Sequence, residues 1–134
     1  MAIITLAEAG SVTTSGLDGT AVTIGHTGSQ VGGPTGVAKG TVYFNITKTA
    51  GGTINPATET LKIMLRAPGS ATWCDVCQSH EDADPVNFFD GVSGASAINR
   101  AFPVTLGSTM KIVIDGDGVD DTYDIDEDIV LEVI

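Results

Sequence analysis

Apolar and polar residues alternate along several short stretches of this chain, and a period of two residues is typical of strands that bury one face. The clearest examples are residues 41–47 and 60–66. Their apolar positions on one side are Val42, Phe44, Ile46, Leu61, Ile63 and Leu65. No stretch carries a convincing helical period. These two stretches are therefore predicted to form strands and to supply part of the core.

Further alternating or β-branched runs are separated by glycine-rich and acidic segments. They predict strands at residues 20–24, 72–78, 99–106, 110–114 and 129–134. The turn residues at 68–71 predict a hairpin between the strands at 60–66 and 72–78. Pro103 has no N–H to donate, which confines its strand to a sheet edge or a bulge. Residues 3–9 fit either an edge strand or a single helical turn.

The composition favours strands joined by turns. The 134 residues include 17 Gly, and only 5% are aromatic. This length suits one domain with a single core. We predict one all-β domain over residues 1–134, an antiparallel β-sandwich of roughly six to eight short strands that is jelly-roll-like or immunoglobulin-like. Residues 1–18 are expected to contain an N-terminal arm with a polar loop at 11–19, and residues 25–40 a flexible glycine-rich loop.

The formal net charge of −11 at pH 7 restricts the partners that the chain can bind by charge. Neutralising nucleic-acid phosphates requires Lys and Arg, and the chain has only six of these residues, scattered along the sequence. We therefore expect no direct nucleic-acid binding and no binding to a membrane. The N-terminus lacks the basic start and the continuous apolar run of a secretory signal, so the protein is expected to be made in the cytoplasm.

An acidic segment separates the last two predicted strands and holds eight of the 17 carboxylates, between residues 115 and 128. Carboxylate oxygens on a glycine-bent loop are the ligands that calcium prefers. The candidate calcium ligands are Asp115, Asp117, Asp120 and Asp121. The alternative is a solvated acidic turn that protects a sheet edge, because Val119 and Asp126 depart from the EF-hand pattern. No other cofactor is expected.

Other candidate chemistry is incomplete. Cys74, Cys77 and His80 have the spacing of part of a zinc site, but no second pair completes the four ligands. We expect no zinc and predict small buried thiols instead. Trp73, the single tryptophan, is predicted either to anchor the core or an interface, or to stack on a sugar ring. No nucleophile elbow or phosphate-binding loop is present in the sequence, so the chain is predicted not to be an enzyme.

Several segments, taken in order, resemble the small β-sandwich capsid decoration (cement) proteins of tailed bacteriophages. These segments are Gly19–Gly25, Thr47–Pro56 running into Leu61–Leu65, Thr72–Val76, Arg100–Val104 and the closing strand–loop–strand. The likeness spans residues 19–134, and the chain departs from the pattern in Cys74, Cys77 and the acidic loop. The hairpin around Trp73 also resembles that of discoidin-like sugar-binding sandwiches.

The resemblance implies a non-enzymatic virion protein that binds the major capsid protein as a homo-oligomer and reinforces the head. A strongly acidic protein also suits the outside of a DNA-filled shell, since the DNA phosphates repel it from the inside. The residues expected to make the contact are Ile3, Ile4, Leu6, Val31, Val37, Phe88 and Phe89. Two alternatives are a calcium-assisted carbohydrate-binding module, built on Trp73 and the acidic loop, and a phage tail or adaptor component.

Overall fold

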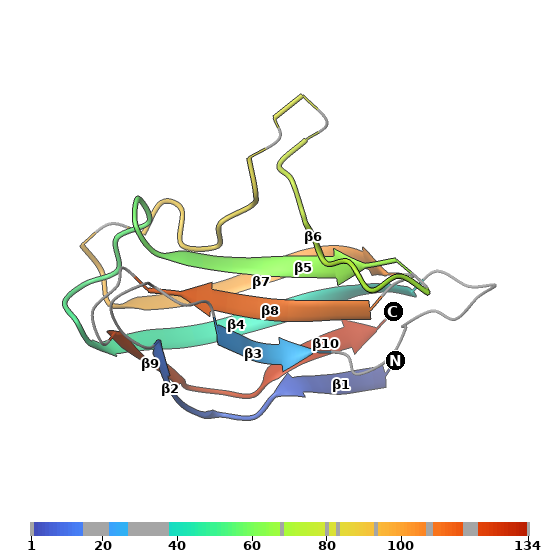
Figure 1. Ribbon diagram of the computed structural model, residues 1–134. Coiled ribbons are helices and arrows are strands. Elements are labelled where there is room, and N and C mark those ends of the chain that lie inside the picture. Colours follow the sequence, from blue (N-terminus) through green and yellow to red (C-terminus); the bar gives the residue numbers. More distant parts are fainter. Residues whose placement is uncertain are drawn as a thin grey trace.

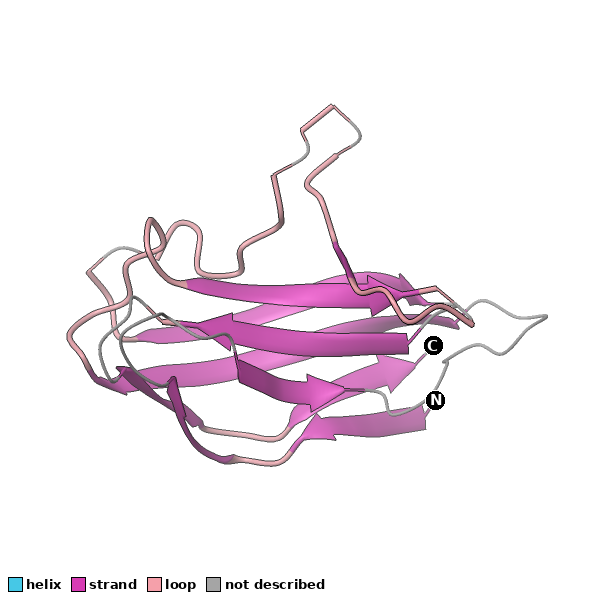
Figure 2. Ribbon diagram, in the orientation of Figure 1, coloured by secondary structure: helices cyan, strands magenta, loops and turns pink. Residues whose placement is uncertain are grey.

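The computed structural model describes residues 2–14, 22–26, 38–67, 69–79, 81–82, 84–92, 94–106, 109–116 and 121–133. These residues form ten strands and no helix (Figures 1 and 2). The strands are β1 (Ala2–Ala7), β2 (Gly10–Thr14), β3 (Val22–His26), β4 (Ala38–Ala50), β5 (Thr60–Arg66), β6 (Cys74–Asp75), β7 (Ala97–Leu106), β8 (Thr109–Asp115), β9 (Asp121–Ile125) and β10 (Ile129–Val133). The predicted all-β class is confirmed.

The strand count exceeds the predicted one because two long strands are each interrupted. β1 continues into β2 and β9 continues into β10, and the two broken strands pair in one antiparallel ladder. Ala2 lies opposite Val133, which brings both ends of the chain together (Figure 1). At the interruption, Ala9 N donates to Asp128 Oδ1 over 2.8 Å. Each broken strand therefore occupies one position in the sheet.

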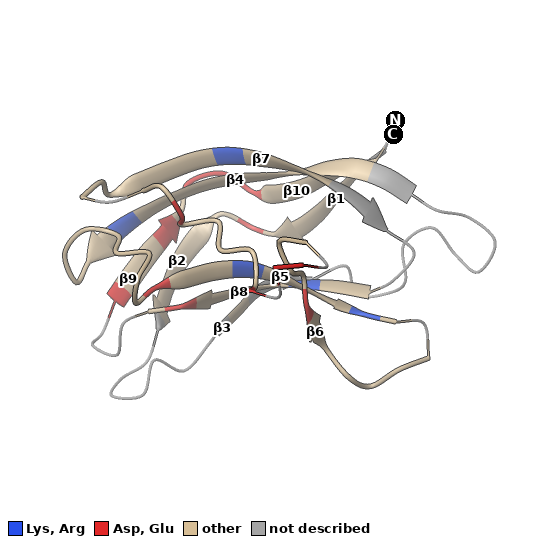
Figure 3. Ribbon diagram, turned by 90° about the horizontal axis from the view of Figure 1, so that it is seen from above, with Lys and Arg blue, Asp and Glu red and all other residues tan. Residues whose placement is uncertain are grey.

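Two antiparallel sheets result, seen as separate layers in Figure 3. In the larger sheet, β4 pairs with β7 on one side and with β9 and β10 on the other, and β1 and β2 form the far edge. Among the described strands β7 pairs with β4 alone, so the predicted edge placement of Pro103 is confirmed. The smaller sheet has the order β3–β8–β5–β6.

The pairing order is that of a jelly roll. With β1/β2 and β9/β10 each taken as one strand, the first strand pairs with the last, β3 with β8, β4 with β7, and β5 with β6. Such a nest of antiparallel pairs, rolled up, gives the two facing sheets of a jelly roll. Of the two predicted sandwich topologies, the jelly roll is therefore the one observed.

Apolar side chains from both sheets fill the space between the layers. The fully buried large side chains are Tyr123, Phe44, Phe89, Ile46, Ile54, Leu61, Met110, Ile112, Ile114, Ile129 and Leu131. Val42 and Ile63 are also buried, and Leu65 is partly buried against the core, so the alternation predicted for β4 and β5 is confirmed. Each buried side chain of this size contributes about 1.5–3 kcal/mol relative to exposure.

The predicted N-terminal arm is instead an edge of the larger sheet. β1 pairs with β10 and β2 pairs with β9, so residues 2–14 lie in the sheet. This corrects the loop predicted at residues 11–19 as far as Thr14. Polar side chains are compatible with a strand here because Ser11 and Thr13 are exposed and β9 supplies the backbone partners.

Two other predicted segments differ in extent. β3 ends at His26 and β4 begins at Ala38, so the predicted loop of residues 25–40 overlaps two strands, and residues 27–37 lie outside the described residues. The predicted strand at 72–78 is reduced to the two residues of β6, although its antiparallel pairing with β5 is as predicted.

After β6 the chain projects as a narrow finger from the edge of the smaller sheet (Figure 1). Backbone hydrogen bonds join the two arms of the projection. Val86 N donates to Val76 O over 2.9 Å, and Gln78 N donates to Asp84 O over 3.1 Å. We call the described residues of this projection, 76–79, 81–82 and 84–86, the acidic finger.

Phe88 and Phe89 seal the edge between the sheets where the chain returns from the acidic finger. Phe88 packs on Phe44 and Phe102, with ring centroids 5.1 and 4.8 Å apart. Phe89 stacks on Tyr123 with a centroid distance of 5.9 Å and is fully buried. The apolar character of the pair is therefore explained by the core, and burial leaves little of either side chain exposed for the partner contact that the sequence predicted.

Candidate functional site

A buried ionic network occupies one end of the core. Lys48 Nζ lies 2.7 Å from Glu59 Oε1 and 3.3 Å from Asp121 Oδ1. Tyr123 donates its hydroxyl hydrogen to Glu59 Oε1. The side chains of the lysine and both acids are at most 1% exposed. Charges buried this deeply persist when they are paired and hydrogen-bonded, as they are here.

The local sequence explains how these groups meet. Lys48 continues the row of inward-facing positions of β4, and it lies opposite Tyr123 of β9 in the ladder. Gly51 has a φ of 96°, which glycine adopts without strain. A Cβ at Gly51 would collide with Asp121 Oδ1, so glycine also allows the loop after β4 to approach this carboxylate.

The network keeps Lys48 charged. Desolvation lowers the pKa of Lys48, but the hydrogen bonds and charges of Glu59 and Asp121 outweigh it, so the pKa is raised above its ordinary value. The second oxygen of Glu59 accepts a hydrogen bond from Asn55 N at 2.5 Å. Because these groups are enclosed and satisfy one another, we interpret the network as a structural element that closes the core.

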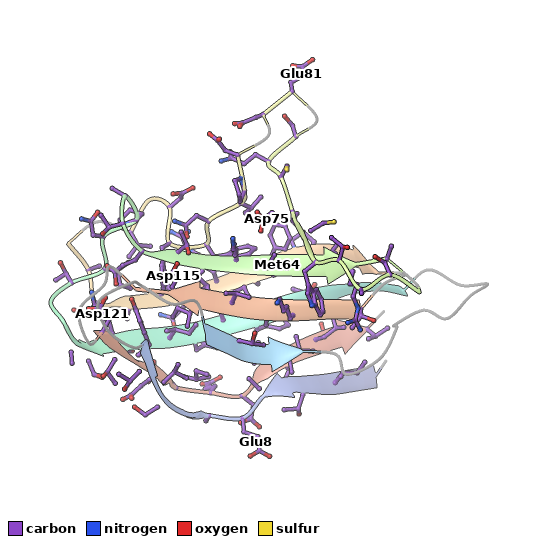
Figure 4. All side chains as sticks on the ribbon, viewed as in Figure 1. Glu8, Met64, Asp75, Glu81, Asp115 and Asp121 are labelled. Atoms are coloured by element: carbon purple, nitrogen blue, oxygen red, sulfur yellow. The ribbon has the colours of Figure 1, made fainter. Side chains whose placement is uncertain are left out.

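The two described residues of the predicted calcium set lie on different sheets. Asp121 faces the core from β9 and pairs with Lys48, whereas Asp115 is half-buried on β8 (Figure 4). Burial raises the pKa of Asp115, and the charge of Lys62 opposes the rise. Asp117 and Asp120 lie outside the described residues. Within the described ranges, no group of three or more His, Cys, Asp or Glu side chains could hold a metal ion.

The cysteines differ from their predicted environment. Cys74 and Cys77 are both exposed and not buried, because Cys74 lies on the edge strand β6 and Cys77 on the acidic finger, not between the sheets. The backbones of Cys77 and Pro85 pair in an isolated antiparallel β-bridge across the finger. His80 lies outside the described residues.

Basic side chains gather around Trp73 on the outer face of the smaller sheet. Arg66 Cζ lies 4.7 Å and Lys111 Nζ 4.6 Å from the centre of the half-buried Trp73 ring. Such contacts contribute about 0.5–1 kcal/mol each at exposed sites. We call Arg66, Lys111 and Trp73 the cationic face. The tryptophan ring is therefore engaged by cations of the same chain.

The outer face of the larger sheet carries the large apolar side chains that are exposed in the described part of the chain. Ile3 is 67% exposed and Tyr43 is 36% exposed. Val130 lies directly opposite Tyr43 in the ladder, and its partner on the other side is Thr5 of β1. Tyr43 donates its hydroxyl hydrogen to Glu132 Oε1 at 3.2 Å, and this hydrogen bond raises the pKa of Tyr43. We call Ile3, Tyr43 and Val130 the apolar face.

The predicted contact residues near the N-terminus divide by strand alternation. Ile3 is exposed, Ile4 is half-buried against the core, and Leu6 is a core residue at 6% exposure. Of the three, Ile3 therefore remains the residue with most of its side chain exposed for the predicted contact, and Leu6 packs in the core. Val31 and Val37 lie outside the described residues.

Sequence reasoning overlooked Lys48 and Glu59. A signal for Lys48 was present, because it falls two residues after Ile46 on the side of the strand predicted to face the core. A charged residue at an inward position implies a buried partner. The partner Glu59 lies beyond a loop and lacks a comparable local signal.

The fold and these surfaces define a jelly-roll β-sandwich with an ionic network inside it. Comparisons of the chain with protein-family models, curated proteins and solved structures find no match. Nothing in the described ranges forms a helix of the length and apolarity needed to span a membrane.

Proposed function

We propose that this chain is a non-enzymatic virion structural protein, a capsid decoration protein that binds the major capsid protein on the outer surface of a phage head and reinforces the lattice. The observation that carries the proposal is the apolar face. Ile3 and Tyr43 project from one side of the larger sheet, and they are the exposed large apolar side chains of the described residues. Exposed apolar side chains gathered on one face are typical of protein–protein contact.

The jelly-roll topology is compatible with a capsid protein but does not distinguish it from other proteins with this fold. Jelly rolls occur in viral capsid proteins and in lectins, and one fold serves many functions. The net charge of −11 suits the outer side of a DNA-filled shell. Around Ile3 the same face presents the uncharged Thr5 and Thr41, and Glu132, which lies opposite Ile3, accepts the hydrogen bond from Tyr43.

Cosedimentation with capsids assembled from the major capsid protein of the same genome tests the proposal. We expect the wild-type chain to sediment with the capsids and the Ile3→Ser/Tyr43→Ser variant to bind at least about tenfold more weakly, since a few central side chains carry most of an interface's energy. Thr13→Ala, on the same sheet but away from the apolar face, is the matched control. A wild-type chain that stays in the supernatant would refute the proposal.

The alternative of calcium-assisted carbohydrate binding has less support from the geometry. Arg66 and Lys111 already contact the ring of Trp73. Lys111 and Asp115 are four residues apart on β8, or about 13 Å, so the ring and the start of the acidic loop lie at opposite ends of the strand. A tail or adaptor role would be distinguished by electron microscopy of labelled particles, with label on tails instead of heads.

A further inference from the structure

The cationic face carries a local excess of positive charge on a strongly acidic chain. Arg66 and Lys111 come from the neighbouring strands β5 and β8, and in the ladder Met64 lies opposite Lys111 and Arg66 opposite Thr109. The two cations are therefore diagonal neighbours, and both contact the Trp73 ring. Like charges at this spacing repel each other unless an anion lies between them.

No carboxylate of the described residues forms a salt bridge with either cation, although Asp75 of β6 is a diagonal neighbour of Arg66. The salt bridges of the described part join Lys48 to its two acids and Lys62 to Asp75, and neither Arg66 nor Lys111 takes part. The undescribed segments next to this end of the sheet in sequence are 27–37, Pro68 and residues 107–108, and none contains Asp or Glu. This is unusual for a chain with 17 acidic and 6 basic residues.

The acidic finger has the opposite character. No Lys or Arg occurs between Arg66 and Arg100, whereas Glu81, Asp82 and Asp84 all lie in the finger and are exposed. Figure 4 shows Glu81 at the far end of the projection, well away from Met64 on β5. These three carboxylates are exposed, whereas Asp75 of β6 pairs with Lys62 of its own sheet.

Internal hydrogen bonds hold the finger in shape before any contact forms. Ser79 N donates to Asp82 O at 3.1 Å, Asp82 N donates to Ser79 Oγ at 2.9 Å, and Asp84 N donates to Asp82 Oδ1 at 3.0 Å. A preorganised segment loses less conformational freedom on docking than a flexible one. The finger is thus suited to insert into a complementary site.

We propose that the acidic finger of one copy docks on the cationic face of a second copy. Charge complementarity carries the assignment: Asp82 and Asp84 would lie against Arg66 and Lys111, and Trp73 would exclude water from the contact. The finger and the face are different surfaces, so the contact is heterologous unless two copies exchange fingers reciprocally. It uses the smaller sheet and is independent of the proposed capsid contact on the larger sheet.

Sedimentation velocity over a concentration series tests the proposal with complementary charge reversals. We expect the wild-type chain to self-associate. Arg66→Glu/Lys111→Glu and Asp82→Lys/Asp84→Lys should each weaken self-association at least about tenfold. Mixing the two variants should restore association, because a basic finger then meets an acidic face. Glu8→Lys/Glu127→Lys makes the same charge change as the finger variant, away from the finger, and should still associate.

Fluorescence of Trp73, the single tryptophan, reports on the same contact. Its emission should change with concentration in the wild-type chain and in the mixture of the two variants. Raising NaCl from 0.05 to 1 M, which lowers the square of the Debye length roughly twentyfold, should reverse the change. A monomeric wild-type chain at every soluble concentration would overturn the proposal. So would association that survives both charge reversals. A fluorescence response to a sulfated oligosaccharide without self-association would assign the face to a different ligand and overturn it as well.

Discussion

At the scale of single residues, the largest predicted effect on stability concerns Lys48. Replacing it by Met leaves the carboxylates of Glu59 and Asp121 buried without a cation. We expect the free energy of unfolding to fall by about 3–5 kcal/mol, because removing the lysine leaves two carboxylate charges in the core without a compensating cation. Lys62→Met, which breaks a partly exposed pair with Asp75, should cost less than about 1 kcal/mol. Urea denaturation at pH 7 measures both, and equal losses would contradict the assignment.

The same network determines how Lys48 responds to alkaline pH. Its pKa is raised in the folded chain. Its contribution to stability is therefore fully present below the ordinary pKa of lysine and is lost as the pH rises through the folded-state pKa. Near neutral pH, the difference in stability between the wild type and Lys48→Met should not depend on this titration.

Gly51 and Gly52 form a matched pair for testing the close approach to Asp121. Both have positive φ, at 96° and 93°. A Cβ at Gly51 would collide with Asp121 Oδ1, whereas a Cβ at Gly52 meets nothing within 4 Å. Gly52→Ala should cost about 1–2 kcal/mol from backbone strain alone, and Gly51→Ala should cost more. Thermal unfolding of both variants measures the two losses of stability. A smaller loss for Gly51→Ala than for Gly52→Ala would be inconsistent with the packing described.

Asp115 provides a test of burial through pH. Its pKa is raised by desolvation, against the pull of Lys62, and one of its oxygens is buried without a hydrogen-bond partner among the described residues. A raised folded-state pKa means that folding favours the protonated form. Stability from this group is present below the ordinary pKa and is lost as the pH rises through the folded-state pKa.

Asp115→Asn should therefore match the wild type in stability at acidic pH and exceed it at neutral pH. Parallel denaturation series from pH 3 to 7, compared as differences between the two proteins, measure the effect. The free energy of unfolding of the variant should exceed that of the wild type by an amount that increases with pH. This difference should stay below about 1 kcal/mol because Asp115 is only half-buried. A variant that loses stability at neutral pH would indicate that the charge is stabilising.

At the scale of elements, the sequence predicts strands well where one face is buried. β4 and β5 have clean alternation, and their large buried apolar residues were all predicted as core. β2 was missed because Ser11 and Thr13 are exposed and its partner, β9, lies more than a hundred residues further on. Local pattern carries no information about such a partner.

Phe88 and Phe89 illustrate a second limit. Two aromatic residues in an acidic, irregular segment resemble an exposed binding motif when only their neighbours in sequence are considered. In the fold, the segment returns across the open edge of the sandwich, and the rings pack on Phe44, Phe102 and Tyr123. Whether an apolar loop residue faces a partner or the core depends on this long-range arrangement.

At the scale of the whole molecule, the sandwich class was predictable but the topology was not. Jelly-roll and immunoglobulin-like folds share short alternating strands and differ in which strands pair. That difference rests on non-local ladders such as β1 with β10 and β4 with β7. The ionic network likewise joins residues from β4, β9 and the loop before β5, so it could not be predicted from any one segment.

The assembled molecule has two outer faces of different chemistry. The larger sheet presents Ile3 and Tyr43, which we propose as the capsid contact, and the smaller sheet presents Arg66 and Lys111, which we propose as the contact between copies. Because the two sheets face in opposite directions, one chain has room for both contacts. A decoration protein that links to its own copies while bound to a shell would reinforce that shell laterally.

The most direct test of this account is cosedimentation of the purified wild-type chain with purified heads and, separately, with purified tails. The account predicts saturable binding to heads, little binding to tails, and loss of head binding in Ile3→Ser/Tyr43→Ser with unfolding transitions still cooperative. Failure of the folded wild-type chain to bind heads, or equal binding to tails, would contradict the central proposal.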